Sequence, residues 1–106
     1  ADYFAHNRLD AAIFPTAPLP ARPIGHDEEV DLGGRLVSTF QTYIRNTDPA
    51  SNAGIPGLSL PVGRTRRGLP VGMEIDGPAG SDRHLLRISF VLEEAFRATT
   101  DDFVEN

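Results

Sequence analysis

Lysine and cysteine are both absent from this sequence of 106 residues. Without cysteine the chain can form no disulfide bond and has no thiolate nucleophile, and this composition predicts a cytoplasmic location. Every basic residue of the chain is an arginine. A mechanism that needs lysine as a base or as a Schiff-base amine therefore cannot be completed within this chain.

Long apolar runs and an excess of positive charge are absent too. No run approaches the roughly 20 apolar residues that cross a bilayer, and the sequence shows no signal peptide. The net charge of −5 at pH 7 argues against nucleic acid and against a membrane as partners. The length corresponds to one modest domain. The sequence begins without methionine and reads like a helix entered midway, which we expect of a piece of a longer protein.

Short apolar segments separated by turn residues predict a mixed helix and strand fold. Strands are expected near residues 11–15, 58–62 and 71–76, and helices near residues 1–7, 35–45 and 82–97. Residues 17–34 and 47–57 are expected to be loops because proline, glycine and acidic residues dominate them. The two later strands are expected to pair as a hairpin around the sequence GRTRRG, which lacks the lysine of a phosphate-binding loop.

The helix near residues 82–97 has more apolar surface than one neighbour can bury. Its expected buried stripe consists of Leu85, Ile88, Val91, Leu92, Ala95 and Phe96. Leu86 and Phe90 lie off this stripe, so the helix is expected to contact a second neighbour.

Side chains that could carry chemistry are scattered. The chain has no Gly-x-Ser-x-Gly motif, so surface positions are favoured over a hydrolase triad for His6, His26 and His84. A metal site built from the acidic loop is disfavoured because it lacks the spaced histidine pair of zinc enzymes; its members would be His26, Asp27, Glu28 and Asp31. We therefore predict no metal, no cofactor and no catalytic residue in this chain.

Glu74 and Asp76 are expected to share one face of the strand at residues 71–76. Paired carboxylates can perform acid–base catalysis. They can equally face solvent or bond to backbone near the edge of the sheet, and this second reading is favoured because acidic residues are usually exposed.

Four segments, in order, resemble the carboxy-terminal part of the amidase signature family. They are LDAAIFPTAPLPA, TDPASNAGIPGLSLPVG, RGLPVGMEIDGP and SDRHLLRISFVLEEAF. The stretches PLPARPIG, NTDPASNAGIPGLSLPVG and GMEIDGP are most similar to the indoleacetamide and mandelamide hydrolase branch. The chain departs from the common family pattern at Glu74 and Asp76, where glutamine and an apolar residue are usual, and at Ser51, where asparagine is usual.

The resemblance implies an α/β fold, an α/β/α sandwich around a mixed sheet, and a hydrolase of carboxylic amides. Such enzymes use a Ser–cis-Ser–Lys triad with a buried neutral lysine, and glycine-rich backbone donors stabilise the tetrahedral intermediate. The lysine and the glycine–serine motif are missing here. Residues 1–106 are therefore expected to be the carboxy-terminal portion of an amidase domain, inactive alone, with the amino-terminal part as its partner.

Loop residues at the ends of short strands are expected to contribute to the acyl pocket of the parent enzyme. The candidates combine one apolar side chain with small polar ones, a mixture that suits an aromatic ring and an amide: Thr16, Ile44, Asn46, Thr47, Ser51 and Asn52. An equal alternative is that Thr47, Ser51 and Asn52 only satisfy turn backbone.

A second hypothesis treats the chain as an independent small binding or structural domain without catalysis. Under the first hypothesis the isolated chain should self-associate, because a sheet cut from a larger one exposes unpaired edges and because Leu86 and Phe90 add apolar surface.

Overall fold

The computed structural model describes residues 2–26, 28–97 and 103–104. Its helices are α1 (Asp2–Asn7), α2 (Thr39–Ile44), α3 (Asp48–Ala53) and α4 (Asp82–Arg97). Its strands are β1 (Ala12–Pro15), β2 (Glu29–Leu32), β3 (Arg35–Ser38), β4 (Gly57–Thr65), β5 (Pro70–Asp76) and β6 (Phe103–Val104). The α/β class and the positions of β1, β4, β5, α1 and α4 agree with the sequence prediction.

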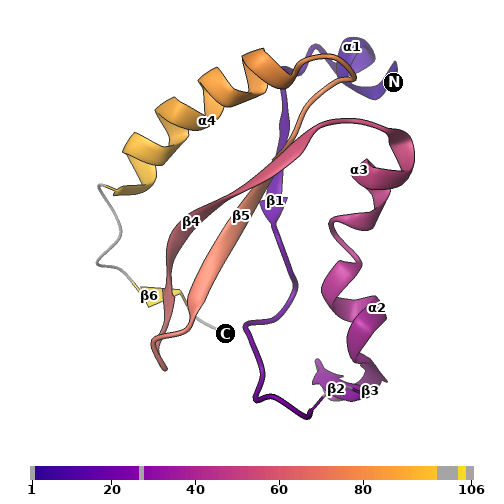
Figure 1. Cartoon of the computed structure of the whole chain (residues 1–106), viewed down its shortest axis with the longest axis vertical. Helices are drawn as coiled ribbons and strands as arrows, with labels where there is room; N and C mark the ends of the chain where they lie inside the picture. Colours follow the sequence, from indigo (N-terminus) through magenta and orange to yellow (C-terminus); the bar gives the residue numbers. More distant parts are fainter. Residues whose placement is uncertain (1, 27, 98–102, 105–106) are drawn as a thin grey trace.

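A sheet of four strands in the order β1-β5-β4-β6 organises the molecule (Figure 1). β5 pairs antiparallel with β1 on one side and with β4 on the other, and β4 pairs in parallel with β6. The predicted hairpin of β4 and β5 is therefore confirmed, and the sheet is mixed. A register shift between Pro61 and Gly63 marks a bulge, which is how the hairpin accommodates a proline within its longer strand.

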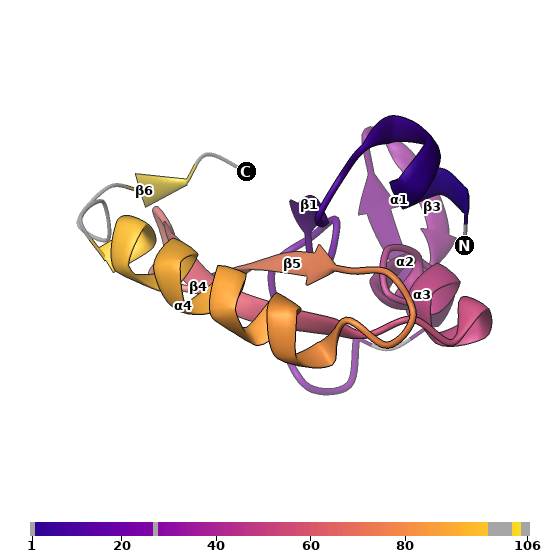
Figure 2. The ribbon, with the colours of Figure 1, turned by 90° about the horizontal axis from the view of Figure 1, so that it is seen from above.

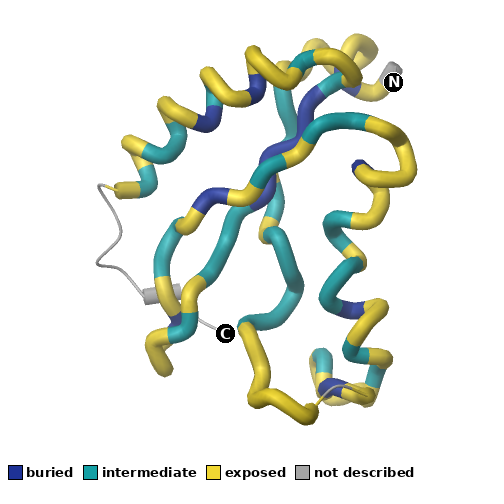
Figure 3. The backbone as a smooth tube through the Cα atoms, in the orientation of Figure 1, coloured by how far each residue is buried: buried dark blue, intermediate teal, exposed yellow. Residues whose placement is uncertain are grey.

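The core lies between the sheet and α4. Leu60 of β4, Ile75 of β5 and Leu85 of α4 form a buried cluster, against which Leu58 and Phe96 also pack. The described part of α4 runs along β4 and β5, whereas α2 and α3 lie on the opposite side of these strands (Figures 1 and 2). Buried positions follow the middle of the sheet and one side of α4, and single buried residues also occur in α1, β2, α2 and α3 (Figure 3).

The buried side of α4 differs from the predicted stripe. Its innermost positions are Leu85 and Ser89, and the Ser89 hydroxyl donates a hydrogen bond to the Leu85 carbonyl at 2.8 Å. Val91 is 69% exposed, and Ala95 is exposed as well. The prediction was wrong at these two residues because a small serine, which counted as polar, packs inward when its hydroxyl bonds to the preceding turn.

The second apolar side of α4 is as predicted. Leu86 is 63% exposed and Phe90 is 70% exposed in this chain. Neither side chain is covered by the elements of the described residues, so α4 presents a free apolar surface on the side away from the sheet.

The helix predicted near residues 35–45 begins four residues late. Arg35–Ser38 is strand β3, which pairs antiparallel with β2 inside the segment predicted to be a loop. Gly33 and Gly34 both have positive φ, 63° and 89°, and the Gly34 N–H bonds to Asp31 Oδ1 at 2.8 Å. This glycine pair forms the tight turn that the hairpin requires.

Residues 48–53, also predicted to be loop, form the short helix α3. Pro49 stands in its first turn, where a missing N–H costs nothing, and Gly54 ends it in the left-handed conformation with φ 70°. The sequence DPASNAG therefore carries start and stop signals for one helical turn and a half, although most of its residues also favour turns.

Candidate functional site

A cavity of about 610 Å³ lies where β1 ends and the chain turns away from the sheet. Its walls come from residues 15–21, from Tyr43 of α2, from the middle of β4 and from the first half of β5. Most of the lining is proline, alanine, leucine, valine and methionine. The polar side chains in the wall are Thr16, Tyr43 and Ser59.

Two hydroxyl groups meet in the wall of this cavity. Thr16 Oγ1 and Ser59 Oγ lie 2.5 Å apart, and either atom can be the donor. Thr16 follows β1 and Ser59 belongs to β4, so the contact spans the intervening strand β5. We call these two side chains the hydroxyl pair.

Gly72 of β5 makes room for the hydroxyl pair. A Cβ atom at Gly72 would lie 2.7 Å from Ser59 Oγ and 3.0 Å from Thr16 Oγ1. The Thr16 N–H also donates to the Gly72 carbonyl at 3.1 Å, which extends the β1–β5 pairing by one residue. Glycine is therefore required here by close approach, the usual reason for glycine within a strand.

Two side chains from the α2 region hold the cavity wall in place. The Tyr43 hydroxyl donates to the Pro20 carbonyl at 2.5 Å, and Asn46 Nδ2 donates to the Pro15 carbonyl at 2.9 Å. The segment between these carbonyls is rich in proline, which offers acceptors but few N–H donors. Side-chain donors therefore supply the hydrogen bonds that backbone pairing cannot.

The six site residues predicted from the sequence do not form one cluster. Thr16 lines the cavity, and Asn46 bonds to the residue beside it. Ile44 is half-buried but is not part of the lining of this cavity.

The other three predicted residues make local contacts or none that reach the cavity. The Thr47 hydroxyl donates to the Ile44 carbonyl at 3.2 Å. Asn52 Nδ2 donates to Asp48 Oδ2 at 3.2 Å within α3, and Ser51 is exposed on the same helix. These contacts match the alternative in which such residues satisfy local polar groups, and their role in substrate binding stays a prediction.

Sequence reasoning missed Ser59, Gly72 and Tyr43. A usable signal existed for Gly72, because glycine inside a strand often marks a close approach of another group. Ser59 alternates with Leu58 and Leu60 along β4, which places its hydroxyl on the face opposite Leu60. No sequence feature connects Tyr43 with Pro20, since that contact depends on the path of a long loop.

Glu74 and Asp76 are buried, each only 6% exposed, so the reading that placed them in solvent was wrong. β5 lies between β1 and β4 rather than at an edge of the sheet. Burial, followed by the hydrogen bond and the negative charge of Asp76, raises the pKa of Glu74 from 4.5 to about 7.

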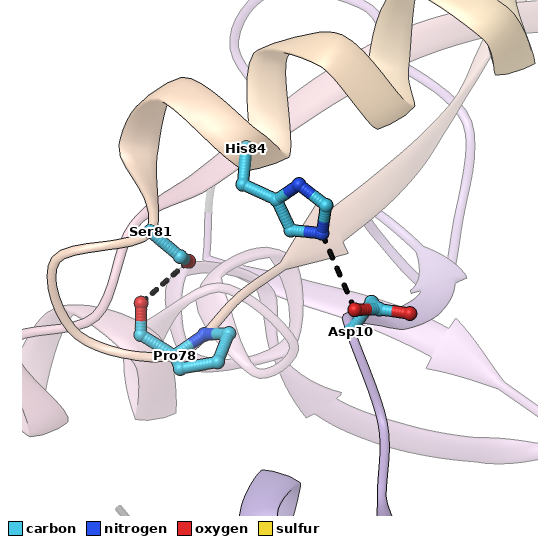
Figure 4. Close-up of polar contacts among 4 residues, drawn as sticks. All are labelled: Asp10, Pro78, Ser81 and His84. Atoms are coloured by element: carbon cyan, nitrogen blue, oxygen red, sulfur yellow. Dashed lines mark hydrogen bonds and ion pairs between the residues drawn. The ribbon is translucent and has the colours of Figure 1, made fainter.

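His84 and Asp10 form the pair that comes nearest to part of a hydrolase triad (Figure 4). His84 Nε2 lies 3.2 Å from Asp10 Oδ1, but both side chains are largely exposed. Ser81 stands close by in sequence, yet its hydroxyl donates to the Pro78 carbonyl at 2.6 Å (Figure 4). The pair therefore lacks a nucleophile, and it links the start of α4 to the segment before β1.

Metal-binding geometry is likewise missing from the described residues. They contain no group of three or more histidine, cysteine, aspartate or glutamate side chains that could hold a metal ion. Of the acidic loop considered from the sequence, Asp27 lies outside the described residues.

None of the helices in the described ranges is long and apolar enough to span a membrane.

The mixed sheet, the packed α4 and the apolar cavity with its hydroxyl pair define the chain as an α/β protein with a cavity beside its sheet. The family model for amidases matches residues 1–86. The chain belongs to the amidase family.

Similar proteins include amide hydrolases of the branch named from the sequence. An indoleacetamide hydrolase of Agrobacterium vitis is 60% identical over 102 residues, which are 94% of this chain and 22% of the relative. A mandelamide hydrolase of Pseudomonas putida is 45% identical over 85% of this chain and 17% of its own length. The chain thus spans about a fifth of the length of the curated relatives it matches.

A solved structure supports the fold. A crystal structure of amidase superposes with a TM-score of 0.76 at 37% sequence identity, over 82% of this chain and 20% of that protein. The expected family and fold are therefore both confirmed.

Proposed function

We propose that this chain supplies one wall of the substrate pocket of an amidase that hydrolyses carboxylic amides, aryl acetamides in particular, to the acid and ammonia. The observation that carries this proposal is the 610 Å³ apolar cavity with the Thr16–Ser59 hydroxyl pair in its wall. The names of two relatives, indoleacetamide hydrolase and mandelamide hydrolase, support an aromatic amide as the substrate.

The chemistry of the cavity fits such a substrate. Apolar and proline-rich walls exclude water around an aromatic ring, and a few polar groups fix its orientation. In the hydroxyl pair one O–H is used between the two oxygens, which leaves one O–H and free lone pairs for a ligand. These can bind the amide or carboxyl group, and Asn46 holds the adjacent carbonyl of Pro15 in place.

The catalytic residues belong to polypeptide outside this chain. The sequence contains no lysine, and the family resemblance assigns the base to a buried lysine. Residues 1–106 then act as the carboxy-terminal portion of an amidase domain, in contact with its amino-terminal part. No cofactor takes part, and the cytoplasmic location stays a prediction from the cysteine-free sequence.

A second candidate is a small binding domain without catalysis. This candidate is favoured by the cavity, because residues of this chain alone form it. The two candidates differ in what the chain does by itself, since a binding domain holds an aryl amide without help, whereas a pocket wall does not.

The test compares the isolated chain with a chimera, in which the chain replaces the matching 102 residues of the Agrobacterium vitis indoleacetamide hydrolase. We expect the chimera to hydrolyse phenylacetamide and the chain alone to release no ammonia. Turnover by the purified chain alone would contradict the proposal. Tight calorimetric binding of phenylacetamide to the chain, together with an inactive chimera, would favour the binding domain.

A further inference from the structure

Glu74 and Asp76 make a second polar site on the face of β5 that also carries Gly72. On the neighbouring strands their register partners are Phe14 and Ser59 for Glu74, and Ala12 and Gly57 for Asp76. None of these partners is titratable. The two acids therefore have each other as the ionisable neighbour across this part of the sheet, and we call them the acid pair.

Gly57 has no side chain, and Asp76 Oδ1 occupies the position that a Cβ atom would take there. A Cβ atom at Gly57 would overlap Asp76 Oδ1 and would lie 3.5 Å from Glu74 Oε2. Both carboxyl groups thus converge over one glycine at the start of β4.

One oxygen of the acid pair lacks a donor. Asp76 Oδ1 is buried and has no hydrogen-bond partner within the described residues. The ion pairs between described residues include His84 with Asp10 and Arg97 with Glu93 and Glu94, and these lie away from the acid pair. A buried carboxylate without a donor is costly, and a charged donor is the partner that compensates it most fully.

The sheet is open beside this site. β6 pairs with β4 only at Arg64 and Thr65, so the described residues leave the outer edge of β4 unpaired near Gly57. A further segment can approach there by pairing with β4 and can bring a side chain to the acid pair.

We propose that the acid pair receives the side chain of an arginine or lysine from polypeptide outside this chain, whose N–H groups bond to Asp76 Oδ1 and Glu74. This inference rests on the proposed function, in which the chain is one part of a larger amidase. The curated relatives, of which the chain spans 17% to 22% in the two cases described, have ample length to supply such a segment. The negative charge of the pair and its burial select a basic side chain rather than a neutral one.

The test uses the same chimera and two isosteric substitutions, Asp76→Asn and Glu74→Gln. If a basic side chain binds, each substitution removes one of the two carboxylates that compensate its buried charge. We then expect the thermal midpoint to fall by several degrees at pH 8.5, and unfolding at that pH to become at least tenfold faster. The exposed acid Glu29 on β2 gives the control, because Glu29→Gln should leave both quantities unchanged.

A stability change in the opposite direction would overturn the inference. If the pair only shares a proton between its members, the chimera becomes less stable as the pH rises from 6.5 to 8.5, and Glu74→Gln leaves it equally or more stable at pH 8.5. Phenylacetamide hydrolysis is recorded separately. If the chimera is active and Glu74→Gln does not change its stability, this inference alone fails. If the chimera folds but is inactive, and Glu74→Gln destabilises it, only the proposed function fails.

Discussion

Glu74 makes the stability of the isolated chain depend on pH, in a direction that the structure fixes. Its pKa is about 7 in the folded chain, against 4.5 for an ordinary glutamate. The folded state therefore binds the proton more tightly than the unfolded state does. The resulting stabilisation is fully present below about pH 4.5 and is lost as the pH rises through about 7.

The size of this effect follows from the difference between the two pKa values. One pKa unit corresponds to about 1.4 kcal/mol, and part of the loss has occurred by pH 5, so the free energy of unfolding should decrease by about 2–3 kcal/mol between pH 5 and pH 8.5. Such a loss is large beside the 5–15 kcal/mol that typically stabilises a whole domain. It arises in this chain because burial and the neighbouring Asp76 both disfavour the charged form of Glu74.

Urea unfolding followed by circular dichroism, at half-unit steps from pH 5 to pH 8.5, measures this dependence. Glu74→Gln should abolish most of it, since the amide cannot ionise and still donates a hydrogen bond to Asp76. Glu29→Gln, at an exposed position of β2, should leave it intact. A wild-type chain whose stability is constant or rises over this range, or a Glu74→Gln variant with the wild-type profile, would refute the reasoning.

Three further predictions concern packing and association in the isolated chain. Leu85→Ala should cost about 2–5 kcal/mol in urea unfolding, whereas Leu86→Ala next to it should cost about 0.5 kcal/mol or less, because Leu85 is buried in the core and Leu86 is exposed. Gly57→Ala should cost about 1–3 kcal/mol, since its Cβ overlaps Asp76 Oδ1; an unchanged urea midpoint would show that the acid pair moves freely. The wild-type chain should self-associate in light scattering, and the double substitution Leu86→Glu with Phe90→Arg should reduce its apparent mass; a monodisperse wild-type monomer would contradict this.

The parts of the fold that were predictable are those where local pattern and tertiary packing agree. The segment at residues 82–97 combines helical apolar spacing with turn residues before it, and α4 occupies that range. β4 and β5 alternate apolar and polar positions around a glycine-containing turn, which predicts a hairpin by local rules alone.

The β3 segment shows where the pattern misleads. Leu36 and Phe40 have helical spacing, but both are exposed in this chain, so the periodicity does not reflect a buried helical face here. The Gly33–Gly34 turn and the pairing of β2 with β3 outweigh it. Propensity is a weak prior when a hairpin turn competes with it.

The candidate site was only partly predictable because it depends on strand order. Thr16 could be named from its position after a strand, whereas its partner Ser59 lies 43 residues away and meets it only across β5. The burial of Glu74 and Asp76 follows from the central position of β5, and no local feature of the sequence tells a central strand from an edge strand when its residues are acidic.

The central claim, that the cavity between β1, β4 and β5 holds the aryl group of the substrate, is tested most directly by filling it. The measurement is the ratio of kcat/KM for phenylacetamide to that for acetamide in the chimera, before and after Val71→Phe. Val71 lines the cavity, and Val91 on the exposed side of α4 provides the matched control, Val91→Phe. We predict that Val71→Phe lowers the ratio at least about tenfold, in line with roughly 1–3 kcal/mol for a pocket contact, and that Val91→Phe leaves it within about twofold. An unchanged ratio in an active Val71→Phe chimera would contradict the account.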